Sequence, residues 1–415
     1  MPGNIKPIKV CRSCHSKNLK KVLDLGELAL SDFTRKPVLT KTKYPLTLLL
    51  CLDCNLVQLK HSIPPQKLYT ERYGYRSGIN KTMRDELSLI VNKATERKKL
   101  KKGNLVIDIG ANDGILLSFY PQNVRKLAVE PVKKFAKECL DQGNLVVSDY
   151  FSRKNIQEAH PKIGKAKIIT AISMFYDLED PNFFLRDVKK MLDQSGIFII
   201  QQNYLLSMLK MNAFDNIVHE HIEYYSLRSL NELLRRNGLR VFDIELSKIN
   251  GGSFRTYISH IDSVYPNSFR VKKFQKEELR YKLDKKNPYD SFARRVKKIR
   301  TKLREYVENE VQKGNKVYLY GASTRGNTIL QYCGLNNKLI SAAVERNPEK
   351  WGKFIASVDI PIISEEQARK DMPPNMLVLP WFFREEFLRR ERHYLERGGK
   401  FIFPLPLVKV VKIKS

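Results

Sequence analysis

A short apolar segment that leads straight into a glycine-containing turn constrains the fold of this chain most. Residues 105–117 read LVIDIGANDGILL, the pattern of a buried strand, a tight turn and the start of a helix. Glycines let the backbone approach a ligand closely, and the following helix directs its first amide groups at that ligand. The segment therefore predicts a dinucleotide or nucleoside site, formed by Asp108, Gly110, Asn112, Asp113 and Gly114.

The rest of the chain continues this alternation of apolar runs and helix-like segments. The runs LAVEP, LVVSDYF, AKIITAIS and GIFIIQQ follow in order between residues 127 and 202. Such a pattern is typical of a parallel sheet covered on both faces. VFDIELS and GGSFRTYIS then predict an antiparallel pair at the end of that sheet, and a second α/β unit begins at KVYLYGASTRG.

These patterns divide the 415 residues into four parts, because a chain of this length is long for one core. We expect a small module over 1–65, an α/β domain over 66–264, a charged helical linker over 265–312 and a second, Rossmann-like α/β domain over 313–415. No apolar run approaches the ~18 residues needed to span a bilayer, and the N-terminus lacks the apolar core of a signal peptide. A cytoplasmic protein is therefore expected.

Four of the six cysteines form two CxxC pairs within the first 54 residues. Two thiolates a tight turn apart occupy two corners of a tetrahedron, and a second pair supplies the other two. A disulfide framework is the weaker explanation in a reducing cytoplasm, and a redox motif would need one pair at a helix start. The spacing predicts a structural zinc site, without an open position for catalysis, formed by Cys11, Cys14, Cys51 and Cys54.

The net charge of +31 leaves several partners open. An excess of this size is compatible with nucleic acid, with anionic lipid, with a phosphate-bearing small substrate, or with a general compositional bias. Lysine and arginine are spread over the whole chain and do not form one basic tail. The charge alone therefore selects none of these partners.

Ionisable and aromatic residues crowd the segment FDNIVHEHIEYYS, residues 214–226. Such a composition is unusual for a plain core element and suits general acid–base chemistry, where imidazole takes a proton and tyrosine hydroxyls stabilise an oxyanion. Metal binding through the HEH residues and structural hydrogen bonding are the alternatives. The catalytic candidates are Glu220, His221, Tyr224 and Tyr225.

Two further glycine turns could shape a substrate pocket. The turn NGGSFR contains Asn250, Gly252, Ser253 and Arg255, and Arg255 could face a phosphate. A plain glycine turn between two strands explains it equally well. The turn GASTRG, which contains Arg325, follows a strand and opens a helix, as a phosphate cradle does. NAD is an improbable ligand there, because the second glycine of a GxG pattern is missing.

The turn after residue 105 resembles the S-adenosylmethionine (SAM) site of class I methyltransferases more than a GxGxxG dehydrogenase site. Glu130 ends the second apolar run, 22 residues after Asp108, where a carboxylate can accept both ribose hydroxyls. In that family the acidic residue after the third strand lies near adenine. The resemblance assigns that place to Asp149, with Tyr150 or Phe151 available to stack.

The order of CxxC…CxxC, YGYRSG, DIGANDG, HEHIEYYS, NGGSFR and GASTRG resembles the bacterial nucleotide-sugar C-methyltransferases over essentially the whole chain. The resemblance implies an N-terminal zinc-binding module, a central SAM-binding sheet and a C-terminal Rossmann-like domain that helps to hold the substrate. It also implies methyl transfer to C3 of a nucleotide-linked 4-keto-deoxyhexose. The family's base maps onto Glu220 and His221, and its YxYxS tyrosines map onto Tyr73 and Tyr75.

This chemistry suits the residues, because a carbon beside a ketone is a weak acid whose methylation needs a base. His221 is the candidate base, and Tyr75, Tyr224 or Tyr225 could donate hydrogen bonds to the enolate. No metal is needed, and a monomer or weak oligomer without nucleic acid or membrane partners would suffice.

Two positions depart from the family pattern: Tyr176 stands where many members have histidine, and Val218 replaces a tyrosine. Both changes alter the wall that faces the substrate. The alternatives are methylation of another small molecule and a zinc-containing RNA methyltransferase. No NPPY-like segment follows the fourth strand, as base methylation would require.

Overall fold

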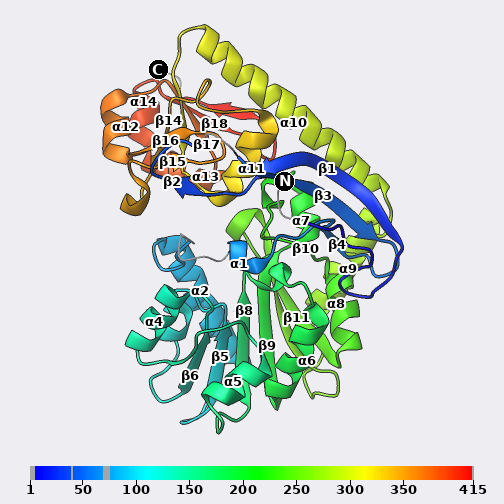
Figure 1. Ribbon diagram of the computed structural model, residues 1–415. Helices are drawn as coiled ribbons and strands as arrows, with labels where there is room; N and C mark the ends of the chain where they lie inside the picture. The colour runs from blue at the N-terminus through cyan, green and yellow to red at the C-terminus, as the bar shows by residue number, and fades with distance from the viewer. Residues whose placement is uncertain (1–4, 39–40, 69–74, 414–415) are drawn as a thin grey trace.

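The computed structural model describes residues 5–38, 41–68 and 75–413, and three β-sheets organise this part of the chain. A seven-stranded sheet forms the domain that contains the catalytic candidates, named the catalytic domain for them, and an eight-stranded sheet forms the C-terminal domain. A four-stranded sheet from the N-terminus lies beside the junction of the two larger domains (Figure 1). The α/β fold with an N-terminal module and a C-terminal Rossmann-like domain, expected from the sequence, is confirmed.

The catalytic sheet has the strand order β11-β12-β9-β8-β5-β6-β7. Each neighbouring pair from β7 through β6, β5 and β8 to β9 is parallel. Strand β12 pairs antiparallel with both β9 and β11, so the predicted antiparallel end is present. The strands are β5 (Leu105–Ile109), β6 (Arg125–Val129), β7 (Leu145–Val147), β8 (Ala166–Ile172), β9 (Leu192–Asn203), β11 (Leu239–Ser247) and β12 (Ser253–His260).

Helices cover both faces of the catalytic sheet, which explains why its central strands are apolar throughout. Side chains of α2, α3 and α4 share a core with one set of alternating strand residues, whereas α5, α6 and α8 pack with the opposite set. The helices of this domain, including α7, which follows β9 in the sequence, are α2 (Lys81–Arg97), α3 (Ile115–Ser118), α4 (Lys133–Asp141), α5 (Arg153–Ala159), α6 (Pro181–Met191), α7 (Leu205–Lys210) and α8 (Leu227–Arg236).

The N-terminal sheet is not built from N-terminal residues alone. Its strand order is β1-β3-β4-β10, with β1 (Leu19–Ala29), β3 (Lys43–Cys51), β4 (Val57–Leu59) and β10 (Glu223–Tyr224). The two-residue strand β10 comes from the HEHIEYYS segment and pairs antiparallel with β4. The short helix α1 (Pro65–Leu68) follows this sheet. The N-terminal module therefore supports the segment that carries the predicted base.

The four cysteines of the two CxxC pairs meet at one end of the N-terminal sheet. Their sulfur atoms all lie within 4.8 Å of one another, and three of the four side chains are buried. Four thiolates around one zinc ion at Zn–S distances of about 2.3 Å produce such a cluster. The cluster fits a structural zinc ion whose four ligands are the thiolates of Cys11, Cys14, Cys51 and Cys54. These ligands fill the tetrahedron and leave no coordination position for a water molecule or a substrate.

The C-terminal sheet has the order β19-β18-β17-β13-β14-β16-β15-β2. Its five central strands are parallel and follow the Rossmann order, in which the first strand lies beside the fourth. The strands are β13 (Val317–Tyr320), β14 (Ala342–Glu345), β15 (Phe354–Ile355), β16 (Ile360–Ser364), β17 (Asn375–Val378), β18 (Lys400–Phe403), β19 (Lys409–Val411) and β2 (Phe33–Thr34). Its helices are α11 (Thr324–Cys333), α12 (Glu365–Asp371), α13 (Arg384–Arg390) and α14 (Arg392–Glu396).

Two helices connect the large domains, α9 (Phe269–Tyr281) and the 26-residue α10 (Asn287–Gln312). Apolar residues recur every three or four positions along α10 and are buried, so the predicted amphipathic helix is present. In Figure 1, α10 runs diagonally past α11 and the long strand β1. No described helix is long and apolar enough to cross a membrane.

Replacing Cys54 with alanine should remove the zinc ion, because three thiolates no longer close the tetrahedron. Zinc-binding free energy is folding free energy in such modules, so we expect the free energy of unfolding to fall by about 3 kcal/mol or more. Metal analysis and thermal denaturation measure the two effects. Cys333→Ala, at a buried cysteine outside the cluster, is the matched control and should retain the metal. Retention of zinc by Cys54→Ala would contradict the assignment.

Candidate functional site

The glycine turn after β5 is arranged to receive a nucleoside. Gly110 adopts φ 71°, and its amide donates a hydrogen bond to the Val129 carbonyl over 2.9 Å. The buried Glu130 carboxylate accepts the amides of Asn112 and Val132, each over 2.8 Å. Burial raises the pKa of Glu130, and the two amides act in the opposite direction. The carboxylate therefore faces the turn in a fixed orientation, as ribose binding requires.

Asp108 lies beneath this turn and accepts the Thr170 hydroxyl over 2.6 Å. Burial, opposed by this hydrogen bond and assisted by the Glu130 charge, raises the pKa of Asp108 to about 7. Gly114 closes the turn at φ 74°, and a Cβ atom there would lie 2.7 Å from the Gln142 side chain. The turn thus leaves a narrow cradle lined by backbone, which suits the SAM expected from the sequence.

The YRSG segment lies directly over the same turn. Asn112 donates its side-chain amide to the Tyr75 carbonyl over 3.1 Å and accepts the Ser77 amide over 3.0 Å. Asp113 accepts the Gly78 amide over 2.8 Å through one carboxylate oxygen. Its other carboxylate oxygen is buried without a hydrogen-bond partner in the described structure. The predicted cofactor residues Asn112 and Asp113 therefore also hold the segment that carries Tyr75.

The three predicted adenine-side residues follow β7 at the carboxyl edge of the sheet. Asp149 and Tyr150 are exposed, and the Tyr150 amide donates to the Asp149 carboxylate over 2.7 Å. Phe151 packs instead against Phe184, with ring centroids 4.9 Å apart. Of the two aromatic residues, Tyr150 has the more accessible ring.

The carboxyl end of β8 brings the cofactor turn and the predicted base together. A Cβ atom at Gly110 would lie 3.1 Å from the Met174 side chain, so this residue borders the turn. Tyr176, two residues further on, packs its ring against that of His221 with centroids 4.3 Å apart. The Ile222 amide donates to the Tyr176 carbonyl over 3.0 Å. The HEHIEYYS segment therefore crosses the end of the strand next to the glycine turn.

The hydrogen bond of His221 determines which nitrogen can act as a base. Its Nδ1 lies 3.0 Å from the Asn216 carbonyl oxygen. A carbonyl can only accept, so Nδ1 carries the hydrogen and Nε2 is left as the basic nitrogen. Burial, with a further contribution from the positive charge of Arg325, lowers the pKa of His221 to about 3. The imidazole is therefore neutral near physiological pH, with Nε2 unprotonated.

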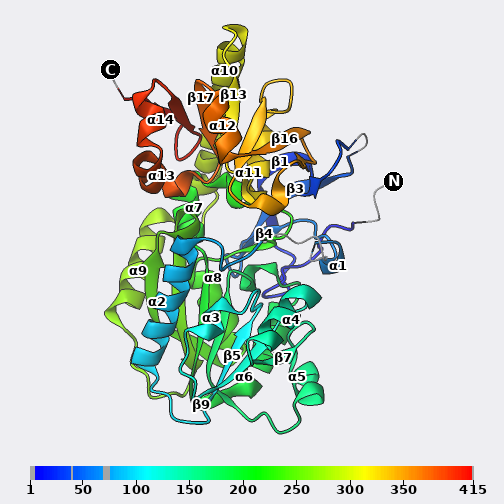
Figure 2. The ribbon, with the colours of Figure 1, turned by 90° about the vertical axis from the view of Figure 1, so that its left-hand side faces the viewer.

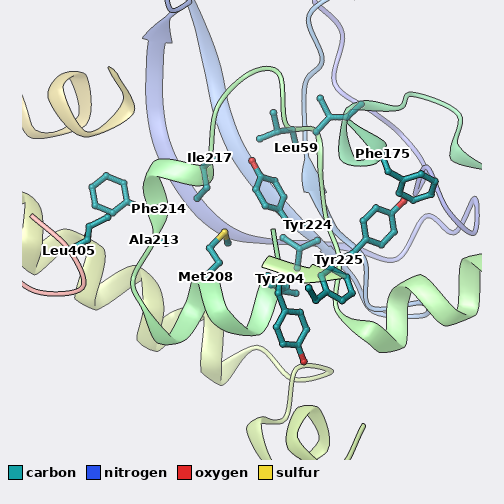
Figure 3. Packing of buried hydrophobic residues seen from close by; sticks show 14 of the residues in the cluster. Leu59, Phe175, Tyr204, Met208, Ala213, Phe214, Ile217, Tyr224, Tyr225 and Leu405 are labelled. Carbon is teal, nitrogen blue, oxygen red and sulfur yellow. The ribbon is translucent and has the colours of Figure 1, made fainter. Parts of the chain in front are cut away.

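Tyr224 and Tyr225 are buried in a cluster between the N-terminal sheet and the catalytic domain (Figure 3). The Tyr224 hydroxyl lies 3.4 Å from the Asn216 carbonyl, and the Tyr225 hydroxyl donates to Glu223 over 2.8 Å. Burial raises the pKa of both tyrosines well above the ordinary value. Both hydroxyls face protein acceptors, and the structure does not bring them into the cavity described next.

A cavity of about 710 Å³ lies where the three domains meet. Tyr75, Glu220 and Asn250 line it from the catalytic domain, and Arg325 lines it from the C-terminal domain. Tyr75 keeps 46% of its surface accessible because that surface faces the cavity, and the surrounding protein raises the pKa of its hydroxyl. Burial likewise raises the pKa of Glu220. Figure 2 shows the first turn of α2 next to the C-terminal domain, where Thr82 donates to Glu386 over 3.1 Å.

Arg325 joins the two large domains. Its guanidinium donates to the fully buried Asp215 carboxylate over 2.7 Å and to the Asn250 carbonyl over 2.9 Å. The Trp381 indole donates to the same Asp215 oxygen over 3.1 Å. Gly251, at φ 81°, would place a Cβ atom only 2.8 Å from the Trp381 ring. The guanidinium borders the cavity but already has a carboxylate partner.

The remaining residues of the NGGSFR turn lie outside the cavity. Arg255 is buried and donates to Gln201 over 2.8 Å and to Glu86 over 2.9 Å, so carboxylate and amide oxygens occupy the guanidinium predicted to face phosphate. Gly252 adopts φ 116°, and the buried Ser253 hydroxyl donates to a backbone carbonyl. Gly252 and Ser253 therefore belong to a turn that supports Asn250.

Tyr73 lies outside the described residues. Sequence reasoning did not select Asp215 or Trp381, because each is isolated in the sequence and meets Arg325 only when the domains pack. Glu345, at the end of β14, was also not selected, although the reasoning that identified Glu130 applies to it: an acidic residue ends the strand that follows a glycine turn.

Three family models match consecutive parts of the chain. A zinc binding domain matches residues 11–69, a methyltransferase domain matches residues 76–244, and a C-methyltransferase C-terminal domain matches residues 248–406. The C-methyltransferase NovU of Streptomyces niveus is 30% identical over 419 residues, which cover 100% of each chain.

Solved structures show weaker likenesses. The magnesium protoporphyrin IX methyltransferase of Synechocystis PCC 6803 with bound SAH is 13% identical with a TM-score of 0.35, covering 45% of this chain and 90% of that one. A Haloferax volcanii methyltransferase in complex with the Trm112 activator is 16% identical with a TM-score of 0.33, covering 40% and 74%.

The three family models give the domain order, and the C-terminal model and the full-length relative both name a C-methyltransferase. The methyltransferase domain contains the glycine turn and Glu130, and the zinc binding domain contains the four-cysteine cluster. SAM and a structural zinc ion are therefore the cofactors. The chain belongs to the family of SAM-dependent C-methyltransferases that combine a zinc-binding domain, a methyltransferase domain and a C-methyltransferase C-terminal domain.

Proposed function

We propose that this enzyme transfers a methyl group from SAM to C3 of a nucleotide-linked 4-keto-deoxyhexose. The cavity at the domain junction carries this proposal. Its wall joins Tyr75 and Glu220, the residue before the predicted base, to the carboxyl edge of the C-terminal sheet, where nucleotides bind in Rossmann-like folds. A volume of about 710 Å³ is within the range of cavities that hold ligands of this size.

The chemistry begins with the hydrogen on C3, which is acidic because the C4 ketone can take up the negative charge. His221 accepts this proton on Nε2, while its Nδ1–H stays on the Asn216 carbonyl. SAM supplies an electrophilic methyl group to the enolate carbon. A carbon–carbon bond forms as the sulfur–methyl bond breaks, and the products are the methylated ketone, S-adenosylhomocysteine and the proton held by the protein.

Two residues of the cavity wall support removal of the proton from C3 in this proposal. The raised pKa of Tyr75 keeps its hydroxyl protonated, so the phenol can donate a hydrogen bond to the developing enolate oxygen. Glu220 lies next to His221 in sequence and faces the cavity, where a carboxylate stabilises the imidazolium that forms. We assign the base to His221 and the supporting roles to these two residues.

The other substrate contacts that we propose are Asn250 and Arg325, with Tyr176 shaping the wall beside the base. The positive charge of Arg325 suits a diphosphate, although the Asp215 carboxylate partly neutralises it. A small phosphate-bearing substrate also accounts for part of the +31 charge without nucleic acid. The cytoplasmic location and the monomeric or weakly associated state stay predictions.

Glu130→Gln should weaken SAM binding on the order of 10- to 100-fold, because the ribose hydroxyls lose a charged acceptor. Calorimetric titration with S-adenosylhomocysteine measures the change. Asp141→Asn, at an exposed carboxylate near the end of α4, is the control and should bind like the wild type. Equal affinities of Glu130→Gln and the wild type would contradict the role assigned to Glu130.

Deuterium exchange separates proton removal from methyl transfer. The protein is mixed in deuterated water with nucleotide-linked 4-keto-6-deoxyhexoses, with and without SAM, and the products are analysed by mass spectrometry. We expect deuterium at C3 without SAM and a methyl gain with SAM. His221→Asn should slow the exchange about 100-fold or more.

His219→Asn is the matched control, because this other histidine of the segment has its hydrogen bond to the Tyr44 carbonyl and packs edge-on against the Tyr44 ring. It should retain the exchange. Deuterium at C5, the other carbon beside the ketone, would refute methylation at C3. If no sugar exchanges while SAM still binds, the sugar assignment fails, and RNA and other small acceptors become the candidates.

The pH profile tests the protonation state of the base. Because the pKa of His221 is lowered, the imidazole stays neutral as the pH falls through 6.5, the ordinary histidine value. The acidic limb of kcat/KM should therefore lie well below pH 6.5. Arg325→Met removes a positive charge that lowers this pKa, so it should move the limb upward. A wild-type limb at the ordinary value would refute the assignment.

A further inference from the structure

Arg12 occupies the turn between two zinc ligands, Cys11 and Cys14, and points into the protein. Its side chain is only 3% exposed, although a buried charge is costly unless hydrogen-bond acceptors surround it. The guanidinium donates to the Glu179 carboxylate over 3.0 Å, the Gln58 side-chain oxygen over 3.2 Å, the Leu59 carbonyl over 2.8 Å and the Ser62 hydroxyl over 2.5 Å. Arg12 therefore joins the zinc-binding module to the catalytic domain from inside the structure.

The fully buried Gln58 connects the zinc cluster to Arg12. Its amide nitrogen donates to the Cys11 sulfur over 3.2 Å, and its oxygen accepts the Arg12 backbone amide over 3.1 Å as well as the guanidinium. Residues that bond to metal ligands in this way keep the ligands in one orientation. The zinc ion and Gln58 together fix the turn from which the Arg12 side chain extends.

The first segment that Arg12 holds is the one that follows the proposed base. The Leu59 carbonyl accepts the guanidinium, and the Leu59 amide donates to the Ile222 carbonyl over 2.8 Å. Ile222 is the residue directly after His221, and β10 begins with the next residue. A single residue of β4 therefore separates Arg12 from the backbone beside the base.

The second segment is the loop between β8 and α6, which packs against the other side of the base. Glu179 lies in this loop, three residues after Tyr176, and its carboxylate pairs with the guanidinium. The Tyr176 ring packs against the His221 ring, with centroids 4.3 Å apart. Arg12 thus contacts the two segments between which His221 is held, and it is not among the described residues that line the cavity.

We propose that Arg12 is a positioning residue, which holds the Tyr176 loop and the Ile222 backbone together so that His221 keeps its productive orientation. Through Arg12, the zinc-binding turn determines the geometry of a base that it does not touch. This inference rests on the proposed function, in which His221 removes the proton. Displacing a reacting group by about 1 Å can cost a hundredfold in rate, so loss of this support should be measurable.

Arg12→Gln should keep its zinc and its affinity for S-adenosylhomocysteine, whereas deuterium exchange at C3 of the sugar should slow about 10-fold or more. The loss should appear in kcat, with KM for the sugar little changed, because Arg12 lies away from the cavity wall. Arg12→Lys keeps the charge that pairs with Glu179 and should recover part of the rate. Wild-type exchange in Arg12→Gln would overturn the inference.

Arg236→Gln is the matched control, because Arg236 supports the same zinc-binding turn from a different side. Its guanidinium donates to the Ser13 hydroxyl over 2.6 Å from the end of α8. This variant should exchange the sugar like the wild type. If Arg236→Gln loses as much exchange as Arg12→Gln, general docking of the turn explains the effect, and the specific role of Arg12 is refuted.

A double-mutant cycle tests the connection to the Tyr176 loop. Glu179→Gln should slow the exchange in part, and Arg12→Gln combined with Glu179→Gln should be no slower than Arg12→Gln alone, because both changes break one ion pair. Glu179 is half-exposed and its replacement leaves Arg12 in place, so it decides the question should Arg12→Gln fail to fold. Wild-type exchange in Glu179→Gln would then overturn the inference.

The orientation of His221 can also be followed without a sugar, by NMR of the protein labelled with carbon-13 in its histidine rings. The His221 signal is identified by its absence from the spectrum of His221→Asn. It should shift in Arg12→Gln and stay in place in Arg236→Gln, with His160 as the unchanged reference. An unshifted His221 signal in Arg12→Gln would refute the positioning role. If the wild type exchanges no sugar, the proposed function fails while these spectra still test Arg12.

Discussion

The ion pair between Asp215 and Arg325 is the contact on which the site depends, because it fixes the C-terminal domain against the catalytic domain. Asp215 is fully buried, and breaking such a pair leaves an uncompensated charge, which typically costs about 3–5 kcal/mol. The next residue, Asn216, orients His221 through its carbonyl. One short turn, Phe214–Asn216, therefore links domain packing to the orientation of the base.

Two short strands that pair within the sheet of another domain reinforce the link between domain packing and the orientation of His221. Strand β10 carries Glu223 and Tyr224 into the N-terminal sheet, and β2 carries Phe33 and Thr34 into the C-terminal sheet. The zinc cluster thus stabilises a sheet whose edge strand belongs to the segment of the proposed base. The long strand β1 and helix α10 pack together across the same junction.

Local patterns predicted the strand and the glycine turn of residues 105–117. The strand, glycine turn and acidic residue at 105–130 form within one βαβ unit, so their geometry follows from short-range backbone rules. Arg255 shows the limit of that reasoning. Its sequence neighbours suggested a phosphate contact, but Gln201 and Glu86 surround the guanidinium, and both come from distant segments. Tyr224 is a second example, because the composition of its segment did not predict that this residue pairs with β4.

The sequence by itself determined the α/β class, the four-cysteine cluster, the amphipathic linker helix and the SAM turn. Each depends on periodicity or on ligand spacing within a short stretch. Only the tertiary structure decided which candidates face one cavity. Tyr75, Glu220 and Arg325 are separated by more than a hundred residues of chain and meet because three domains pack around a buried ion pair. Long-range packing of this kind leaves no local pattern in the sequence.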